Sequence, residues 1–278
     1  MMLHTKKFST LYGQDNLAIC DLPGFVEFAG KVTGYKRTSS NSSWYGGMLF
    51  DQSLECVRKG DLAGVPASDK FLAAFENLIP VSRAWRTYDS VVGGSVNVPA
   101  FLAGQPLSMR QRRRVLIETA PLCVMADLTS SAGISADNVR KRGCAILALV
   151  RLLSAIRPVE LWAVIALGVR GQRDSVCVRL DTAPLDLARA AHVLTHPSVS
   201  RCLGYGSLHQ AFNAGGQWGY GDIDKHRKCA ADTYREHLCP GSDALFVPPV
   251  FLTDDSINAP EKWLRDMIAR YGGMPAAA

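Results

Sequence analysis

A short apolar segment that runs into an acidic, hydroxyl-rich loop most constrains the fold of this chain. Residues 121–126 are apolar throughout, which is typical of a buried strand, and Asp127-Leu-Thr-Ser-Ser131 follows them directly. Ser135 then begins a segment with helical spacing, because its hydroxyl suits a helix N-cap and Asp137 adds a favourable negative charge to the first turn. The sequence therefore predicts a buried strand, a polar loop and a buried helix, in that order.

The segments after this unit predict an α/β architecture. Residues 158–167 are almost continuously apolar, and a short turn joins them to a strand at residues 175–180, so we expect an antiparallel hairpin. A further short strand is expected at residues 244–247. Helices are expected at residues 50–59, 69–78, 184–194, 224–238 and 259–271. The glycines within residues 204–221 predict a non-helical segment there.

The expected fold is α/β, with a mixed, mainly parallel sheet flanked by helices in residues 116–278. Residues 1–115 are expected to form a smaller, mostly helical N-terminal region that packs on this sheet. The boundary follows the basic segment of residues 109–114, which we interpret as a linker or as the edge of a second lobe.

The composition is that of an ordinary folded protein, with 47% apolar and 20% charged residues. The formal charge of +6 steers a nucleic acid only if the excess is clustered. Eight cysteines without a C-x-x-C pair, several of them in apolar segments, are typical of reduced core thiols. The N-terminal residues lack a hydrophobic signal core and the apolar stretches are interrupted, so we expect a soluble, intracellular protein with no membrane span.

The loop after the first buried strand offers one carboxylate and two hydroxyls. Asp127, Thr129 and Ser131 supply these oxygens, and hard cations such as Mg²⁺ and Mn²⁺ are bound by such ligands. The same side chains also suit the free amide groups at the start of the following helix. A divalent-metal site and simple capping are both open interpretations of this loop.

The order of these elements resembles the first half of a von Willebrand factor A domain. The resemblance covers residues 121–194 and implies a Rossmann-like sheet whose first strand ends in a metal-binding loop, completed by a ligand carboxylate. It carries over the three loop ligands, with a threonine in place of the usual first serine. Leu252-Thr-Asp-Asp255 is similar to the Thr-Asp-Gly of that family, which makes Asp254 a further ligand, but the glycine is absent.

Several phrases spread over nearly the whole chain resemble an uncharacterised family of bacteriophage proteins. They are Ser43-Trp-Tyr-Gly-Gly47, Asn97-Val-Pro-Ala-Phe-Leu-Ala-Gly104, Arg140-Lys-Arg-Gly143, Arg157-Pro-Val-Glu-Leu-Trp162 and Asp181-Thr-Ala-Pro-Leu-Asp-Leu-Ala-Arg189. The resemblance implies a phage or prophage origin and brings no activity with it. It places the protein in the cytoplasm of an infected bacterium, or with the virion, and makes a phage or host protein the expected partner.

Four residues near the C-terminus have side chains that zinc accepts. They form the pairs His-x-x-Cys and His-x-Cys, in His226, Cys229, His237 and Cys239. The second pair is unfavourable on a helix, because residues two apart point to different faces. Solvated histidines and buried thiols are the alternative interpretation.

The basic segment is a candidate for phosphate contacts. Its arginines are Arg110, Arg112, Arg113 and Arg114. A second group extends it if both groups lie on one face, namely Arg140, Lys141 and Arg142. Aromatic side chains are then stacking groups for single-stranded DNA, among them Trp44, Tyr45, Trp218 and Tyr220. A solvated linker beside an aromatic core is the alternative.

Three functions are compatible with these patterns. The first is a non-enzymatic binding or adaptor protein that uses the loops at the carboxyl end of the sheet, where open α/β sheets place ligands, and that depends on a divalent metal. The second is a nucleic-acid-binding factor in phage replication or transcription. The third is a metal-dependent hydrolase in which Asp127 acts with Asp222, Asp224 or Asp254, although no carboxylate pair has a fixed spacing. No catalytic residue is assigned.

Overall fold

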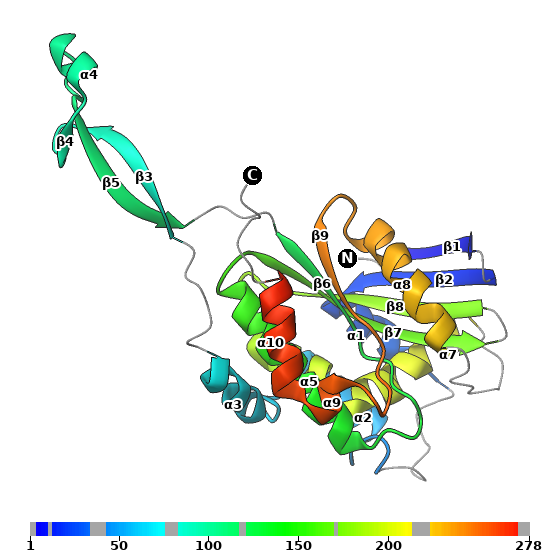
Figure 1. Ribbon diagram of the computed structural model, residues 1–278. Coiled ribbons are helices and arrows are strands. Elements are labelled where there is room, and N and C mark those ends of the chain that lie inside the picture. Colours follow the sequence, from blue (N-terminus) through cyan, green and yellow to red (C-terminus); the bar gives the residue numbers. More distant parts are fainter. Residues whose placement is uncertain are drawn as a thin grey trace.

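The computed structural model describes residues 4–10, 13–33, 43–75, 83–116, 121–169, 172–212 and 223–271. Figure 1 shows a body with a sheet at its centre and helices on both faces of the sheet, and an arm that extends away from this body. Within the described residues, no helix is both long and apolar enough to cross a membrane.

Six strands of the described chain form the sheet of the body, in the order β1-β2-β8-β7-β6-β9. They are β1 His4–Thr10, β2 Gly13–Asp21, β6 Leu122–Asp127, β7 Val159–Val169, β8 Gln172–Leu180 and β9 Asp243–Val247. Three of the five pairings are parallel, those of β2 with β8, β7 with β6 and β6 with β9. The other two are antiparallel, including the expected hairpin of β7 and β8. The predicted α/β fold with a mixed, mainly parallel sheet is confirmed.

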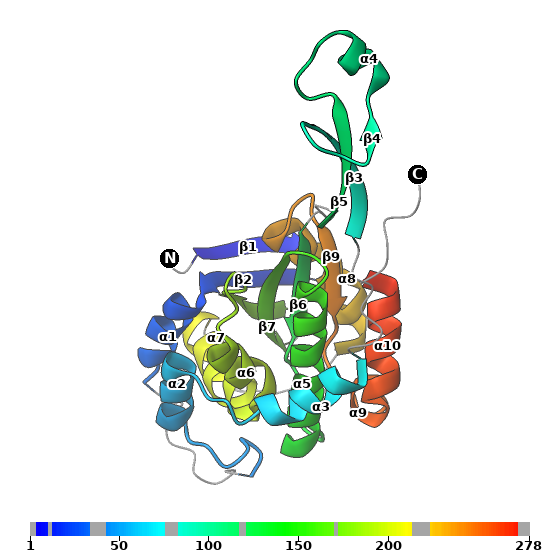
Figure 2. The ribbon, with the colours of Figure 1, turned by 90° about the vertical axis from the view of Figure 1, so that its left-hand side faces the viewer.

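Of the helices in the described ranges of the body, most cover one face of the sheet and one covers the other. The first group is α1 Leu22–Gly30, α2 Phe50–Lys59, α3 Val65–Phe75, α5 Ala136–Ser154, α6 Leu187–Thr195, α7 Tyr205–Phe212, α9 Asp255–Asn258 and α10 Pro260–Tyr271. On the second face, α8 Ile223–Leu238 packs Tyr234 and Leu238 against strand residues such as Met125 and Trp162 (Figure 2). Both faces of the central strands are therefore buried.

The N-terminal region differs from the expected one. β2 pairs with β8 from Asp15 to Asp21, so residues 1–115 and 116–278 share one sheet. The region also contains strands β3 Arg83–Ser90, β4 Ser95–Val96 and β5 Met109–Leu116 beside its helices. Six consecutive residues of β2, from Asp15 to Cys20, are buried because both faces are covered. Such a strand lacks the alternation that identifies strands in a sequence.

A second, three-stranded sheet forms the arm, in the order β3-β5-β4. β3 and β5 pair antiparallel from Arg83 and Leu116 at one end to Ser90 and Met109 at the other. The short helix α4 Val98–Leu102 lies at the far end of the arm, as Figures 1 and 2 show. The basic segment, for which a linker and the edge of a second lobe were both open, is therefore strand β5 of the arm.

The prediction of a non-helical segment at residues 204–206 was wrong. A π-helical turn, η3 Val199–Gly204, continues into α7. Gly204 is required for close packing rather than for a turn, because a Cβ atom there would lie 2.6 Å from Cδ1 of Ile165 on β7. The other glycines of this segment, at residues 215–221, lie outside the described residues.

Close packing of α5 on α6 depends on Gly143. A Cβ atom at this position would lie 2.2 Å from the carbonyl oxygen of Leu194 and 2.5 Å from Cα of Thr195. Both of these are backbone atoms, which cannot rotate away as a side chain does. The glycine therefore sets the distance between the two helices.

We expect Gly143→Ala to lower the free energy of unfolding by about 1–3 kcal/mol, the usual cost of overpacking. Urea unfolding followed by circular dichroism measures this change. Gly133→Ala is the matched control, because no atom lies within 4 Å of its added Cβ. Equal stability of the two variants would contradict the proposed packing role of Gly143.

Candidate functional site

In the loop after β6, two of the three predicted metal ligands, Asp127 and Thr129, make hydrogen bonds to backbone groups of the protein itself. Asp127 is buried, and its Oδ1 accepts a hydrogen bond from the backbone N of Thr129 at 2.8 Å. The Thr129 hydroxyl accepts from the backbone N of Ala166 on β7 at 2.8 Å and lies 3.4 Å from the carbonyl of that residue. Ser131 is half-buried further along the loop. Both side chains thus satisfy backbone amides of the loop and of β7, whereas the cap of α5 is Ser135, which accepts from the backbone N of Asn138 at 3.2 Å.

Two buried arginines fill the space beyond the carboxyl ends of β6 and β9. Arg142 donates from Nη1 to the carbonyl of Asp127 at 3.0 Å and from Nη2 to the carbonyl of Pro248 at 2.5 Å. Arg201 donates from Nη2 to the carbonyl of Ile134 at 2.7 Å. A guanidinium group is always charged, so each one repels a cation at this edge. The geometry therefore favours a structural role for the loop over a Mg²⁺ or Mn²⁺ site.

Asp254 also makes a local contact. Its Oδ2 accepts from the backbone N of Phe251 at 2.7 Å, just before α9. Among the described residues, neither Asp254 nor Asp127 belongs to a group of three or more His, Cys, Asp or Glu side chains close enough to hold an ion. Asp222 lies outside the described residues, as does the side chain of Asp224.

Burial dominates the electrostatics of Asp127. It raises the pKa of this carboxyl to about 6, against the smaller lowering effects of the Thr129 hydrogen bonds and of the Arg142 and Arg173 charges. Arg173 itself pairs with Asp15 at 2.8 Å inside the protein. The carboxyl therefore belongs to a buried polar network at this end of the sheet.

The predicted zinc ligands do not form one group in the described structure. Cys239, which follows α8, forms a disulfide with Cys123 of β6, so its sulfur is not free for a metal. The expectation that all cysteines are reduced is therefore wrong for this pair. His237 is half-buried at the end of α8. The side chains of His226 and Cys229 lie outside the described part of the chain.

The two predicted basic groups lie apart. Arg110 and Arg112 are exposed on β5 of the arm, whereas the second group lies at the start of α5 in the body (Figure 1). In that second group Arg142 is buried, and Arg140 donates to the carbonyl of Gly46. Lys141 is exposed. The side chains of Arg113 and Arg114 are outside the described ones.

The arm holds most of the net charge of the chain. Residues 83–116 contain six arginines and one aspartate, a formal charge of +5 out of the total of +6. The rest of the chain is nearly balanced. The charge excess is therefore clustered, which is the condition for electrostatic attraction of a nucleic acid.

Sequence reasoning missed a further group of possible metal ligands, which consists of Cys56, Asp61 and His192. One ligand atom of each lies within 4.8 Å of those of the other two. His192 also stacks on His196, one helical turn later, with ring centroids 5.0 Å apart. The spacing of four between these histidines is the one signal in the sequence that marks this place. The distant partners Cys56 and Asp61 carry no such signal.

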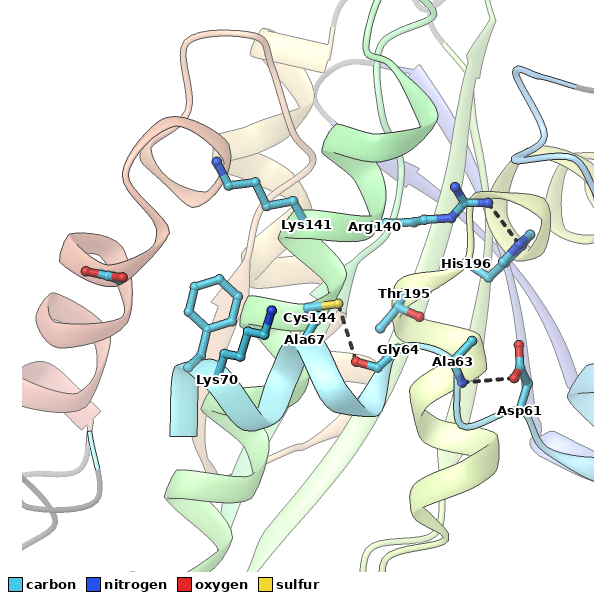
Figure 3. A pocket seen from close by; sticks show the side chains of 12 residues that line it. Asp61, Ala63, Gly64, Ala67, Lys70, Arg140, Lys141, Cys144, Thr195 and His196 are labelled. Atoms are coloured by element: carbon cyan, nitrogen blue, oxygen red, sulfur yellow. Dashed lines mark hydrogen bonds between the residues drawn. The ribbon is translucent and has the colours of Figure 1, made fainter. Parts of the chain in front are cut away.

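A pocket of about 470 Å³ lies next to this group, between α3, α5 and α6. Figure 3 shows Asp61 and His196 at one end of the pocket, and Lys70 and Lys141 at the other. Burial, followed by the charges of His192 and Arg140, lowers the pKa of His196 to about 4. His196 is therefore neutral near pH 7.

The family model for a domain of unknown function (DUF7192) matches residues 14–272, which include the arm, the Cys56 group and all strands of the main sheet except β1 and the first residue of β2. The chain belongs to this family. No curated protein and no solved structure matches the chain. Because the DUF7192 match runs through residues 83–116, the arm is part of the family domain. The resemblances to von Willebrand factor A domains and to bacteriophage proteins stay predictions.

The raised pKa of Asp127 makes stability depend on pH. The carboxyl is neutral in both states below its ordinary pKa of 3.8, and as pH rises to about 6 the unfolded state ionises first. The free energy of unfolding is therefore highest in acid, where the carboxyl is neutral in both states. It falls by roughly 3 kcal/mol in total as the pH rises from 3.8 to about 6. We expect the unfolding free energy of the native protein, relative to Asp127→Asn, to fall between about pH 4 and pH 6. A difference independent of pH would show that burial does not perturb this carboxyl.

Proposed function

We propose that this protein binds nucleic acid through the arm of β3, β4 and β5, and that duplex DNA is the preferred form. The observation that carries this proposal is the concentration of +5 of the +6 net charge in an arm that extends from the body (Figures 1 and 2). A projecting basic element brings its charge to the phosphates without contact between the body and the nucleic acid.

Two exposed arginines on β5 supply the first phosphate contacts. Arg110 and Arg112 are two residues apart on one strand, so they lie on the same face of the arm. Their partners across β3 are Asp89 and Thr87. A guanidinium group binds phosphate oxygens in pairs, which makes arginine suited to this role.

The width of the arm supports duplex DNA over a single strand. β-Ribbons of DNA-binding proteins lie in a groove of the duplex, and β3 with β5 is a two-stranded ribbon over the six residue pairs from Arg83 and Leu116 to Tyr88 and Gln111, before β4 joins β5. Binding of a single strand generally uses aromatic side chains along a groove. Among the side chains of β3 that the structure describes, Tyr88 is the exposed aromatic one.

The far end of the arm exposes apolar side chains. Val92 is 75% exposed, Phe101 63% and Leu102 79%. Proteins that deform DNA insert such side chains between base steps while their basic residues hold the flanking phosphates. The tip of the arm therefore supports a DNA-bending role.

The biological setting of this activity comes from the resemblance to bacteriophage proteins. A DNA-binding protein of that origin acts in replication or transcription of the phage genome. The geometry gives less support to an adaptor that uses the carboxyl end of the sheet, because Arg142 and Arg201 fill that edge.

The double variant Arg110→Ala/Arg112→Ala tests the proposal. We expect weaker binding to a short DNA duplex in fluorescence anisotropy, and a salt dependence whose logarithmic slope falls by about 2, one for each lost phosphate contact. The matched control removes two exposed charges from α10, in Lys262→Ala/Arg265→Ala, and keeps the native slope. Equal loss in both variants, or native binding by the arm variant, would refute the arm as the binding element. Tighter binding to single-stranded DNA would overturn the preference for duplex.

The apolar tip makes a separate prediction. Phe101→Ser/Leu102→Ser removes the two side chains that we expect to enter the base stack, and leaves the arginines in place. End-to-end fluorescence energy transfer on a labelled duplex should then show less bending, with an unchanged salt slope. Native bending in this variant would exclude insertion by the tip.

A further inference from the structure

The packing of α2 on α6 brings three residues with metal-binding side chains together. Cys56 lies in the last turns of α2, Asp61 follows that helix, and His192 lies on α6. Gly60 ends α2 with a φ of +90°, and a Cβ atom there would lie 2.6 Å from Cβ of Ala188 on α6. The backbone at the end of α2 therefore turns in close contact with α6.

Backbone contacts hold this reversal in place. The backbone N of Asp61 donates to the carbonyl of Ala188 at 3.0 Å. Nε of Arg189 donates to the carbonyl of Arg58 at 3.0 Å. Both contacts join α6 to the end of α2, so the three side chains project from a fixed frame. A preorganised frame lowers the cost of gathering ligands around an ion.

Asp61 is oriented toward the centre of the group. Its Oδ1 accepts from the backbone N of Ala63 at 2.9 Å, which leaves Oδ2 to face Nδ1 of His192 at 3.4 Å. Figure 3 shows the first of these contacts. Tetrahedral coordination of zinc by sulfur, nitrogen and oxygen places the ligand atoms about 3.3–3.6 Å apart. The group, with its ligand atoms within 4.8 Å of one another, needs only small side-chain movements to reach this geometry.

We propose that Cys56, Asp61 and His192 bind a divalent transition metal of the zinc class, with a fourth coordination position open to solvent. A set of one thiolate, one carboxylate and one imidazole suits Zn²⁺ and Co²⁺ rather than Mg²⁺, which requires oxygen ligands. Three protein ligands with an open position are the arrangement of zinc sites that bind a water or a substrate.

The protonation state of the His192 imidazole agrees with metal binding. Burial lowers the pKa of His192, against the opposing effects of Asp61 and the Ser53 backbone, so its imidazole is neutral and can bind an ion near pH 7. Burial and the charges of Asp61 and Glu55 raise the pKa of the Cys56 thiol. Metal binding at Cys56 therefore displaces the thiol proton. A bound metal ion deprotonates such a thiol.

The open position has access to solvent through Cys56. This residue lines a groove of about 700 Å³ together with Gly47, Met48 and Gln52. On the other side, Asp61 lines the pocket of Figure 3. The proposed metal therefore lies between two hollows, where water or a small anionic ligand can reach it.

Metal titration of the untagged, full-length protein tests this proposal. We expect one Zn²⁺ per chain in calorimetry, no Mg²⁺ binding, and a thiolate-to-cobalt charge-transfer band in the near ultraviolet when Co²⁺ is added. Cys56→Ser should remove the band and weaken Zn²⁺ binding at least about tenfold. The matched control is Cys144→Ser, which changes a buried thiol of the neighbouring α5 and should keep the band.

Asp61→Asn provides a second variant, because its amide oxygen can still accept from Ala63 while the negative charge is lost. We expect weaker Zn²⁺ binding with the cobalt band retained at higher Co²⁺ concentration. Circular dichroism confirms that each variant is folded. Absence of stoichiometric binding to the native protein, or a cobalt band that survives in Cys56→Ser, would overturn the proposal, and the latter result would assign the metal to another thiol.

Discussion

The burial of β6 is the constraint on which the rest of the body depends. A strand with parallel neighbours on both sides cannot be joined to them by hairpins, so the chain must cross over the sheet after each one. α5 makes the first crossover to β7, and α8 precedes the return to β9. The strand order reverses at β6, which makes its carboxyl end the position where open sheets usually bind ligands.

This protein fills that position with its own side chains. Arg142 and Arg201 donate to backbone carbonyls of the surrounding loops. The backbone N of Val250 also donates to the carbonyl of Thr129, which joins the loops after β9 and β6. Hydrogen bonds and two fixed positive charges therefore join the loops at this edge. The functions that we propose use two other places, the arm and the contact between α2 and α6.

The helices and strands that the sequence predicts correctly are those whose apolar residues form one continuous run or one regular helical pattern. β6, α5, β7 and the β8 hairpin follow from apolar runs and a serine cap, since Ser135 does accept from the backbone N of Asn138. β5 is not predicted, because its arginines suggest a solvated linker. α7 is not predicted either, because the glycine that precedes it allows close packing against Ile165 instead of breaking the helix. The group of Cys56, Asp61 and His192 escapes because its members are up to 136 residues apart, and only tertiary packing brings them together.

The arm leaves the body and returns to it at one place, because Arg83 and Leu116 are paired at its base. It contributes no strand to the main sheet, whose register is set by other residues. In architectural terms the arm is an insertion whose length is independent of the core. Lengthening or shortening β3 and β5 by matched pairs changes how far the apolar tip reaches from the body, while the hydrophobic interior keeps the same neighbours.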